Sequence, residues 1–148
     1  MPKEEKLKLD DYLPYLVNRV GAALVGRFSR EALAAHALSI DMWRVLARLA
    51  DSGGQRQIDL ADATSIEAST ISRIVTRLVR QGLVDRSRSK TSSREVIVEL
   101  SPKGKTLVGK LIPIARRLER QAGTGIASKD LTDLKNALRR VYANLARG

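Results

Sequence analysis

The chain has 148 residues, 43% of them hydrophobic and 29% charged, so it can bury one core beneath a charged surface. Its 27 Lys and Arg residues outnumber its 16 Asp and Glu residues, and the net charge of +11 favours polyanionic partners. It has no cysteine and one histidine, which excludes disulfides, zinc–thiolate centres and multi-histidine metal sites.

The sequence also lacks the usual signals of an enzyme or a membrane protein. There is no Gly-rich phosphate loop and no Cys–His or paired-carboxylate pattern, so we expect no catalysis, no cofactor and no metal. No apolar run approaches the roughly 20 residues that span a bilayer. The start of the chain, MPKEEK, has mixed charge and does not resemble a secretory signal. We therefore expect a cytoplasmic protein with no membrane partner.

The first predicted element is a long amphipathic helix over residues 10–35. Its apolar face consists of Leu13, Leu16, Val17, Val20, Leu24 and Phe28. Pro14 fits the first turn, where a missing N–H costs little. Gly21 and Gly26 lie on a second side of small residues, which lets another helix approach closely.

Three shorter helices are predicted next along the chain. Ser39 is expected to cap a helix that runs through Asp51. A short helix over residues 57–63, a turn at residues 64–66 and a helix over residues 68–81 follow. Two short helices joined by a tight turn form a helix-turn-helix, in which the second helix enters the major groove of DNA.

The helix over residues 68–81 has two unlike faces. Its apolar side carries Ile71, Ile74, Val75, Leu78 and Val79. Its opposite side carries Ser69, Arg73, Thr76, Arg77 and Arg80. Hydroxyl groups bond phosphates or base edges, and an arginine can grip guanine in the major groove. A polar helix face alone is more often ordinary solvated surface, but the flanking elements favour a DNA-reading helix.

A β-hairpin is predicted after this helix, because Gly82 ends the helix and a strand begins near Leu83. The return strand alternates, with Val96, Val98 and Leu100 on one side. The loop over residues 88–94 is basic and serine-rich, and residues 73–94 hold seven basic side chains and one acid. Such a wing suits contact with phosphates or the minor groove. The alternative is a generic solvated hairpin loop.

Two amphipathic helices are predicted at the end of the chain. Ser101 and Pro102 supply the cap and first position of one helix, which Pro113 should bend. Ser128 is expected to cap the other helix, whose apolar residues step by three and four: Leu131, Leu134, Leu138, Val141 and Leu145. Apolar faces at both ends of the chain favour a symmetric homodimer. The alternative is a monomer whose end helices fold back on its own core.

These elements predict a mostly α fold with a small β-hairpin wing, that is, a winged helix-turn-helix with N- and C-terminal dimerisation helices. We assign residues 1–36 to the N-terminal dimerisation helix, residues 37–104 to the winged helix-turn-helix DNA-binding region and residues 105–148 to the C-terminal dimerisation helices. A homodimer would hold two recognition helices about 34 Å apart, in successive major grooves of double-stranded DNA.

Five segments, in this order, resemble the multiple antibiotic resistance regulator (MarR) family: Trp43-Arg44-Val45-Leu46, Leu60-Ala61, Ser69-Thr70-Ile71-Ser72-Arg73, residues 78–84 and residues 98–104. The resemblance covers about residues 9–145. It implies a homodimeric transcriptional regulator, typically a repressor, that binds a pseudo-palindromic operator and is released by a small effector such as an aromatic acid or its thioester. The alternative is a winged-helix architectural or protein-interaction module without a specific operator.

The resemblance also assigns the DNA contacts. Base readout falls to Ser69, Thr70, Ser72 and Arg73, and phosphate anchoring to Arg77, Arg80, Arg86, Arg88, Lys90 and Arg94. Ser92 stands where the family's wing usually carries Asp, so the pair that would orient Arg94 is missing and Arg94 is expected to be either more mobile or aimed differently. Ser65 stands where the family often has Gly. If that position needs a positive φ, serine lowers the stability of the fold.

The effector site is expected near the first two helices, because the family binds ligands between its dimer helices and its winged-helix unit. The polar and aromatic candidates there are Arg19, Arg27, His36, Trp43 and Arg44. An arginine can hold a carboxylate, and Trp43 can stack on a ring. The alternatives are core packing for Trp43 and helix termination for His36. Residues 103–120 hold six basic side chains and one acid, which either give solubility or attract an anionic effector.

Overall fold

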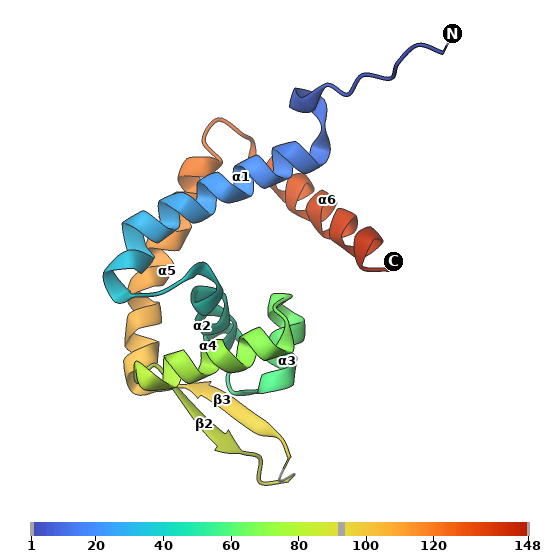
Figure 1. Ribbon diagram of the computed structural model, residues 1–148. Coiled ribbons are helices and arrows are strands. Elements are labelled where there is room, and N and C mark those ends of the chain that lie inside the picture. The colour runs from blue at the N-terminus through green and yellow to red at the C-terminus, as the bar shows by residue number, and fades with distance from the viewer. Residues whose placement is uncertain (1, 92–93, 148) are drawn as a thin grey trace. The chain divides into compact units, whose positions relative to one another are not determined.

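Six α-helices and three short strands form among residues 2–91 and 94–147, the part of the chain that the computed structural model describes (Figure 1). The chain divides into two compact units, Met1–Ala115 and Arg116–Gly148. The predicted mostly α winged helix-turn-helix is confirmed, and it lies within the first unit. None of the helices in the described part of the chain is long and apolar enough to cross a membrane.

The predicted first helix is regular only in part. A short 3-10 turn, Leu9–Asp11, precedes α1, Leu13–Phe28, and Pro14 lies in the first turn of α1 as expected. The helical path then continues through a π-helical turn, Ser29–Leu33, and a 3-10 turn. Ala37 ends it in the left-handed region at φ 53°. The sequence therefore predicted the extent of the helical path but not its change of pitch.

The helix-turn-helix is formed by α3, Gln57–Thr64, and α4, Ala68–Arg80, and α2, Ile40–Ser52, packs against both of them. The Ser39 hydroxyl caps α2 by accepting the backbone N–H of Met42 at 3.2 Å, as predicted. The fully buried side chains between these helices include Val45, Leu46, Leu60, Ile71, Val75 and Leu78.

One predicted core position on α4 is wrong. Val79 is 40% exposed, although Ile71, Ile74, Val75 and Leu78 are buried. At about 100° per residue, Val79 lies at the edge of the arc that these four residues define around the helix axis. The buried face of α4 is therefore narrower than the apolar pattern suggested, and its outward face is correspondingly wider.

The wing belongs to a three-stranded antiparallel sheet with the order β1-β3-β2. The hairpin strands β2, Val84–Arg88, and β3, Val96–Leu100, were predicted, whereas β1, Gln55–Arg56, was not. Two residues carry no readable alternation, so the sequence gives no signal for β1. Val84 and Val98 are buried and anchor the base of the hairpin against the helices, and the hairpin extends away from them (Figure 1).

The last two helices are α5, Pro102–Ala122, and α6, Ser128–Ala146. The expected cap of α6 is wrong. Ala127 occupies the N-cap position, and Ser128 is the first helical residue, because the carbonyl of Ala127 already accepts the N–H of Leu131 at 3.0 Å. Within the second unit, α6 exposes the large apolar side chains Leu134, Leu138, Tyr142 and Leu145.

The turn between α3 and α4 places a serine in a left-handed conformation. Ser65 has φ 58° and ψ 31°, so the position does require a positive φ. A side chain in this conformation destabilises the folded state by about 1–2 kcal/mol. Glycine would remove that strain, but it would also increase the conformational entropy of the unfolded chain, which offsets part of the gain in stability. Ser65→Gly is therefore expected to raise the free energy of unfolding by up to about 1 kcal/mol, measured by urea titration. Ser72→Gly, inside α4, is the control and should lower it.

Candidate nucleic-acid interface

The outward face of α4 presents a stripe of polar and basic side chains. Ser69, Arg73, Arg77 and Arg80 are exposed, whereas Thr70 and Ser72 are half-buried. The stripe is a consequence of the helix period, since burial of the opposite apolar arc turns these positions outward. A shallow groove of about 360 Å³ runs along this face, lined by Ser72, Arg73, Thr76, Arg77 and Arg80.

Arg73 lies in the middle of this stripe. One of its terminal nitrogens donates to the hydroxyl of Thr70 at 3.3 Å, one turn towards the N-terminus of α4. Both residues were predicted to read bases, so the structure brings two members of that set into contact. A guanidinium supported from its own helix is held ready for a planar, bidentate partner such as the edge of guanine.

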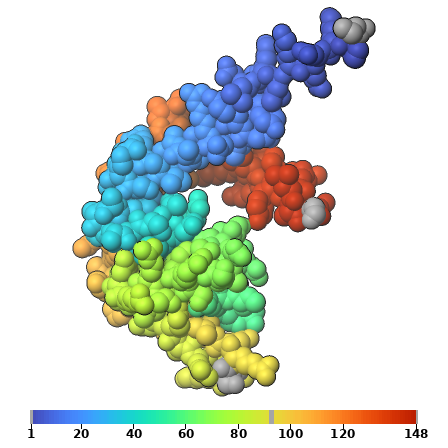
Figure 2. Space-filling view, viewed as in Figure 1, coloured from blue at the N-terminus to red at the C-terminus, as the bar shows by residue number. Residues whose placement is uncertain are grey.

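The wing supplies further cations beside α4. Figure 2 shows the hairpin surface next to that of α4 within the first unit. Arg88 at the end of β2, Lys90 in the loop and Arg94 before β3 are all exposed. The loop entrance is ordered by a bond from the backbone N–H of Ser89 to the carbonyl of Glu95 at 2.9 Å. Ser92, which was expected to change the aim or the mobility of Arg94, lies outside the described residues.

Arg86 was predicted to anchor phosphate, but its guanidinium has partners inside the protein. It donates to the hydroxyl of Thr76 at 2.9 Å and to the backbone carbonyl of Ser72 at 3.3 Å. The Thr76 hydroxyl in turn donates to the same Ser72 carbonyl at 2.9 Å. Strand β2 is therefore tied to the middle of α4 by a three-residue network.

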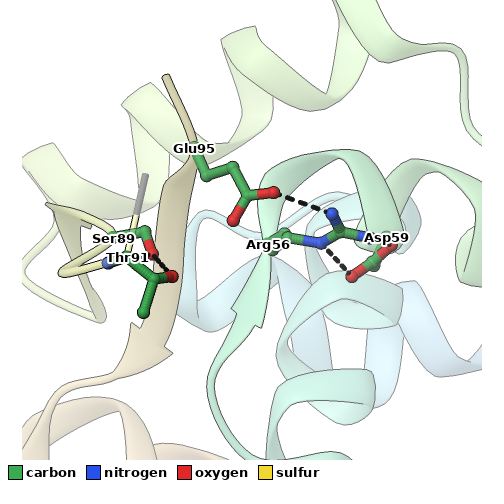
Figure 3. Close-up of polar contacts among 5 residues, drawn as sticks. All are labelled: Arg56, Asp59, Ser89, Thr91 and Glu95. Atoms are coloured by element: carbon green, nitrogen blue, oxygen red, sulfur yellow. Dashed lines mark hydrogen bonds and ion pairs between the residues drawn. The ribbon is translucent and has the colours of Figure 1, made fainter. Parts of the chain in front are cut away.

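A second arginine joins the other edge of the sheet to α3. Arg56 makes a bidentate contact with the carboxylate of Asp59, at 2.9 and 3.0 Å, and a 2.9 Å contact with Glu95 (Figure 3). The hydrogen bond and charge of Arg56 hold the pKa of Asp59 below its ordinary value. The two carboxylates raise the pKa of Arg56 in turn. Arg56 and Asp59 are thus charged at neutral pH, and together with Glu95 they link α3 to the start of β3.

The end of α4, the start of β2 and the start of α5 meet at a tight junction. Gly82 ends α4 at φ 73°, and its carbonyl accepts the hydroxyl of Ser101 at 2.6 Å. That hydroxyl also accepts the backbone N–H of Gly104 at 3.0 Å, which caps α5 as predicted. Lys103 donates to the carbonyl of Gln81 at 3.0 Å. The direction in which α4 presents its outward face is therefore fixed at its C-terminal end.

Four of the five candidates for effector binding have partners close by in the sequence or in the neighbouring helix. Arg19 donates to the hydroxyl of Tyr15 at 3.4 Å, Arg27 pairs with Glu31 at 2.9 Å, and Arg44 pairs with Asp41 at 3.1 Å. Trp43 is half-buried and packs edge-on against Phe28, with ring centroids 5.1 Å apart. His36 is exposed and lines a depression of about 400 Å³ together with Ala37, Arg80, Gln81, Leu83, Lys103 and Leu107.

Several residues that shape the interface were not predicted. Arg56, Asp59 and Glu95 were not considered, and Thr76 was placed on the outward face of α4 without a role. The spacing of Arg56 and Asp59 at the start of a helix was a readable signal for an i,i+3 pair. Glu95 and Arg86 could not be found in this way, because their partners depend on the packing of separate elements.

Comparison with known proteins gives consistent matches. A model of the MarR family matches residues 38–96. The HTH-type transcriptional repressor NicR of Pseudomonas putida is 40% identical over 73 residues, which cover 49% of this chain and 46% of NicR. The crystal structure of a MarR family transcriptional regulator from Silicibacter pomeroyi superposes with a TM-score of 0.84 at 26% identity, covering 99% of this chain and 98% of that one.

A third match is to BpsR of Bordetella bronchiseptica, whose DNA binding is regulated by 6-hydroxynicotinic acid. It superposes with a TM-score of 0.78 at 24% identity, covering 88% of this chain and 98% of BpsR, which supports the fold. The winged helix-turn-helix, the basic outward face of α4 and the family match at residues 38–96 agree with one another. By its match at residues 38–96 and by its fold over almost its whole length, the chain is similar to the MarR family of DNA-binding transcriptional regulators.

Proposed function

We propose that the protein is a homodimeric, ligand-responsive regulator, acting as a repressor, that binds a pseudo-palindromic operator. The observation that carries this proposal is the division of α4 into a buried apolar arc and an exposed stripe of Ser69, Arg73, Arg77 and Arg80 beside a cationic wing. A helix of this kind meets base edges with its N-terminal half, and the wing cations meet the flanking phosphates.

In this proposal the contacts divide by chemistry. Ser69, Thr70, Ser72 and Arg73 lie in the N-terminal half of α4 and read bases. Arg77 and Arg80 in its last turn, together with Arg88, Lys90 and Arg94, anchor phosphates. Because the phosphate contacts are independent of sequence, they supply most of the salt dependence of binding, whereas the base contacts supply the preference for one site.

Homodimer formation is supported by apolar helix faces that are exposed to solvent in a single copy of the chain. Helix α1 exposes Leu13, Leu16, Val17 and Val20, and α6 separately exposes the four large apolar side chains named above. Large exposed apolar patches are unusual on monomers and are typical of association surfaces. We therefore keep residues 1–36 and 105–148 as the proposed dimerisation segments, which flank the DNA-binding region at residues 37–104.

The proposed effector is a small aromatic acid or its thioester. BpsR, a relative in fold, responds to 6-hydroxynicotinic acid, which is such a molecule. On this chain the candidate contacts stay Arg19, Arg27, His36, Trp43 and Arg44. The proposed partners are thus double-stranded DNA, a second copy of the chain and this effector, and the proposed place of action is the cytoplasm.

Footprinting on the DNA that flanks the coding region tests the regulatory function. We expect protection of one short palindrome, and we expect a duplex that carries a single half-site to bind more weakly than the full site. Sedimentation at the same protein concentrations should show the mass of a dimer. Protection without a defined register would instead indicate an architectural protein, and a monomer bound to a half-site would contradict the symmetric assembly.

Titration with 6-hydroxynicotinic acid and other aromatic acids tests the sensor function. A ligand that binds the folded dimer should raise its melting temperature and release the labelled operator over the same range of concentration. Acids without an aromatic ring serve as controls. If every aromatic acid and thioester leaves both the melting temperature and operator binding unchanged, the proposed effector class is wrong.

Lys90→Ala is expected to weaken binding to operator and random-sequence DNA by the same factor. Lys90 is exposed in the wing loop and is assigned to phosphate, which is the same in every sequence. Loss of one phosphate contact should reduce the slope of log K against log salt concentration by about one. Fluorescence anisotropy at several salt concentrations measures both quantities. A loss confined to the operator would mean that Lys90 takes part in sequence recognition.

A further inference from the structure

We infer that Arg56 and Arg86 are positioning residues that hold the wing in one orientation relative to α4 and thereby fix where the wing cations meet DNA. The inference rests on the proposed DNA-binding function and deepens it. It also gives Arg86 an internal role in place of the phosphate contact expected from the family resemblance. We refer to the two sets of contacts as the Arg86 clamp (Arg86, Thr76, Ser72) and the Arg56 clamp (Arg56, Asp59, Glu95).

The two clamps lie on opposite edges and opposite faces of the sheet. Strand β3 is the central strand, with β1 on one side and β2 on the other. Arg56 pairs in register with Ile97 and Arg86 with Val98, which are successive residues of β3. Successive side chains of a strand point to opposite faces, so the two arginines lie on opposite faces at nearly the same level. Together they restrain the hairpin from swinging to either side.

The Arg56 clamp acts beyond the point where burial holds the wing, whereas the Arg86 clamp lies level with the buried Val98. Val84 and Val98 are buried at the base of the hairpin, whereas Arg88, Lys90 and Arg94 are exposed further out. Glu95 precedes the first residue of β3, on the loop side of the buried Val98, so the Arg56 clamp grips the hairpin nearer its tip. Apolar packing alone would therefore fix only the base.

In each clamp the hydrogen-bond donors and acceptors are matched. The hydroxyl of Thr76 gives its hydrogen to the carbonyl of Ser72, so its lone pairs face a donor, and Arg86 supplies one. Arg56 holds two carboxylates that come from different elements, which the planar fork of a guanidinium can do and an ammonium group cannot do in the same geometry. The Arg56 clamp thus depends on the geometry of the arginine fork as well as on its charge, whereas one terminal nitrogen of Arg86 makes both contacts of its clamp.

A spin label at position 90 tests the inference without DNA. The chain has no cysteine, so Lys90→Cys gives one labelling site, and electron paramagnetic resonance reports the mobility of the nitroxide. We expect mobility to rise when Glu95→Gln or Thr76→Val is added. Glu99→Gln, the same change four residues further along the chain, and Thr76→Ser, which keeps the hydroxyl, should leave it unchanged. Arg86→Lys repeats the test should Thr76→Val fail to fold. Equal mobility in all these proteins would overturn the inference.

A double-mutant cycle with DNA separates an internal role for Arg86 from a phosphate contact. Arg86→Gln and Thr76→Val should each weaken operator binding roughly tenfold, the usual worth of one hydrogen bond to a charged group. The double variant should lose no more operator affinity than the single variant that binds the operator more weakly. The salt slope should stay unchanged for Arg86→Gln and fall by about one for Lys90→Gln.

The opposite pattern would show that Arg86 contacts phosphate. In that case Arg86→Gln lowers the salt slope by about one, and its loss multiplies with that of Thr76→Val. A wild-type protein that binds no operator would instead overturn the proposed function. The mobility of the label at position 90 would still decide whether the clamps hold the wing, so the two failures remain distinguishable.

Discussion

Replacing Arg73 with alanine is expected to weaken binding to the operator by about 1–3 kcal/mol and to relax the preference for one base pair in each half-site. The side chain projects from the exposed stripe of α4 and is supported by Thr70. A bidentate contact with guanine is lost as a whole when the guanidinium is removed. Random-sequence DNA offers no such contact in register, so its affinity should change much less.

The measurement is a pair of titrations, one with operator and one with random DNA, for the wild type and for two variants. Arg77→Ala is the matched control, because it lies one turn further along the same face and is assigned to phosphate. It should lower both affinities alike. If Arg73→Ala and Arg77→Ala give equal losses on the two DNAs, the division between base readout and phosphate anchoring is wrong.

Gly104→Ala is expected to destabilise the fold by about 3 kcal/mol. A Cβ atom at this position would overlap the backbone carbonyl oxygen of Leu83 and crowd the side chain of Leu100. The same carbonyl accepts the backbone N–H of Ser101 at 3.0 Å, so it cannot move without breaking the junction. Because that junction fixes the end of α4, operator binding should fall together with stability.

The matched control is Gly109→Ala in the same helix. A Cβ atom at Gly109 meets no atom within 4 Å, and Ala is a better helix former than Gly by about 1 kcal/mol. The same substitution five residues along α5 should therefore stabilise the protein, while Gly104→Ala destabilises it. Chemical denaturation measures both changes. Equal effects at the two positions would mean that the close approach at Gly104 is not limiting.

Much of the fold could be predicted from the sequence, because it is determined by residues that are close together in the chain. Ser39 and Ser101 cap helices where the sequence indicated, and Gly82 has the positive φ that its place after a helix requires. The buried arc of α4 follows from the spacing of Ile71, Ile74, Val75 and Leu78. In each case the signal and the structure it specifies lie within one or two helical turns.

The parts that escaped prediction depend on partners far apart in the sequence. Arg56 meets Glu95 across 39 positions, and Arg86 meets Thr76 across 10, through the packing of separate elements that no local pattern specifies. The family resemblance placed Arg86 among the phosphate contacts and gave no sign of its contact with Thr76. At Ser128 a purely local prediction failed. Serine is a suitable N-cap residue, but Ala127 takes that position because α6 begins one residue earlier than predicted.

The edge-on contact between Phe28 and Trp43 gives this regulator an optical property of its own. Trp43 is the only tryptophan of the chain, so all indole emission arises where the end of α1 meets α2. Indole fluorescence responds to the polarity and packing around the ring. A small molecule that parts the two rings would change the colour or intensity of that light, which would allow the proposed sensing step to be timed in unlabelled protein.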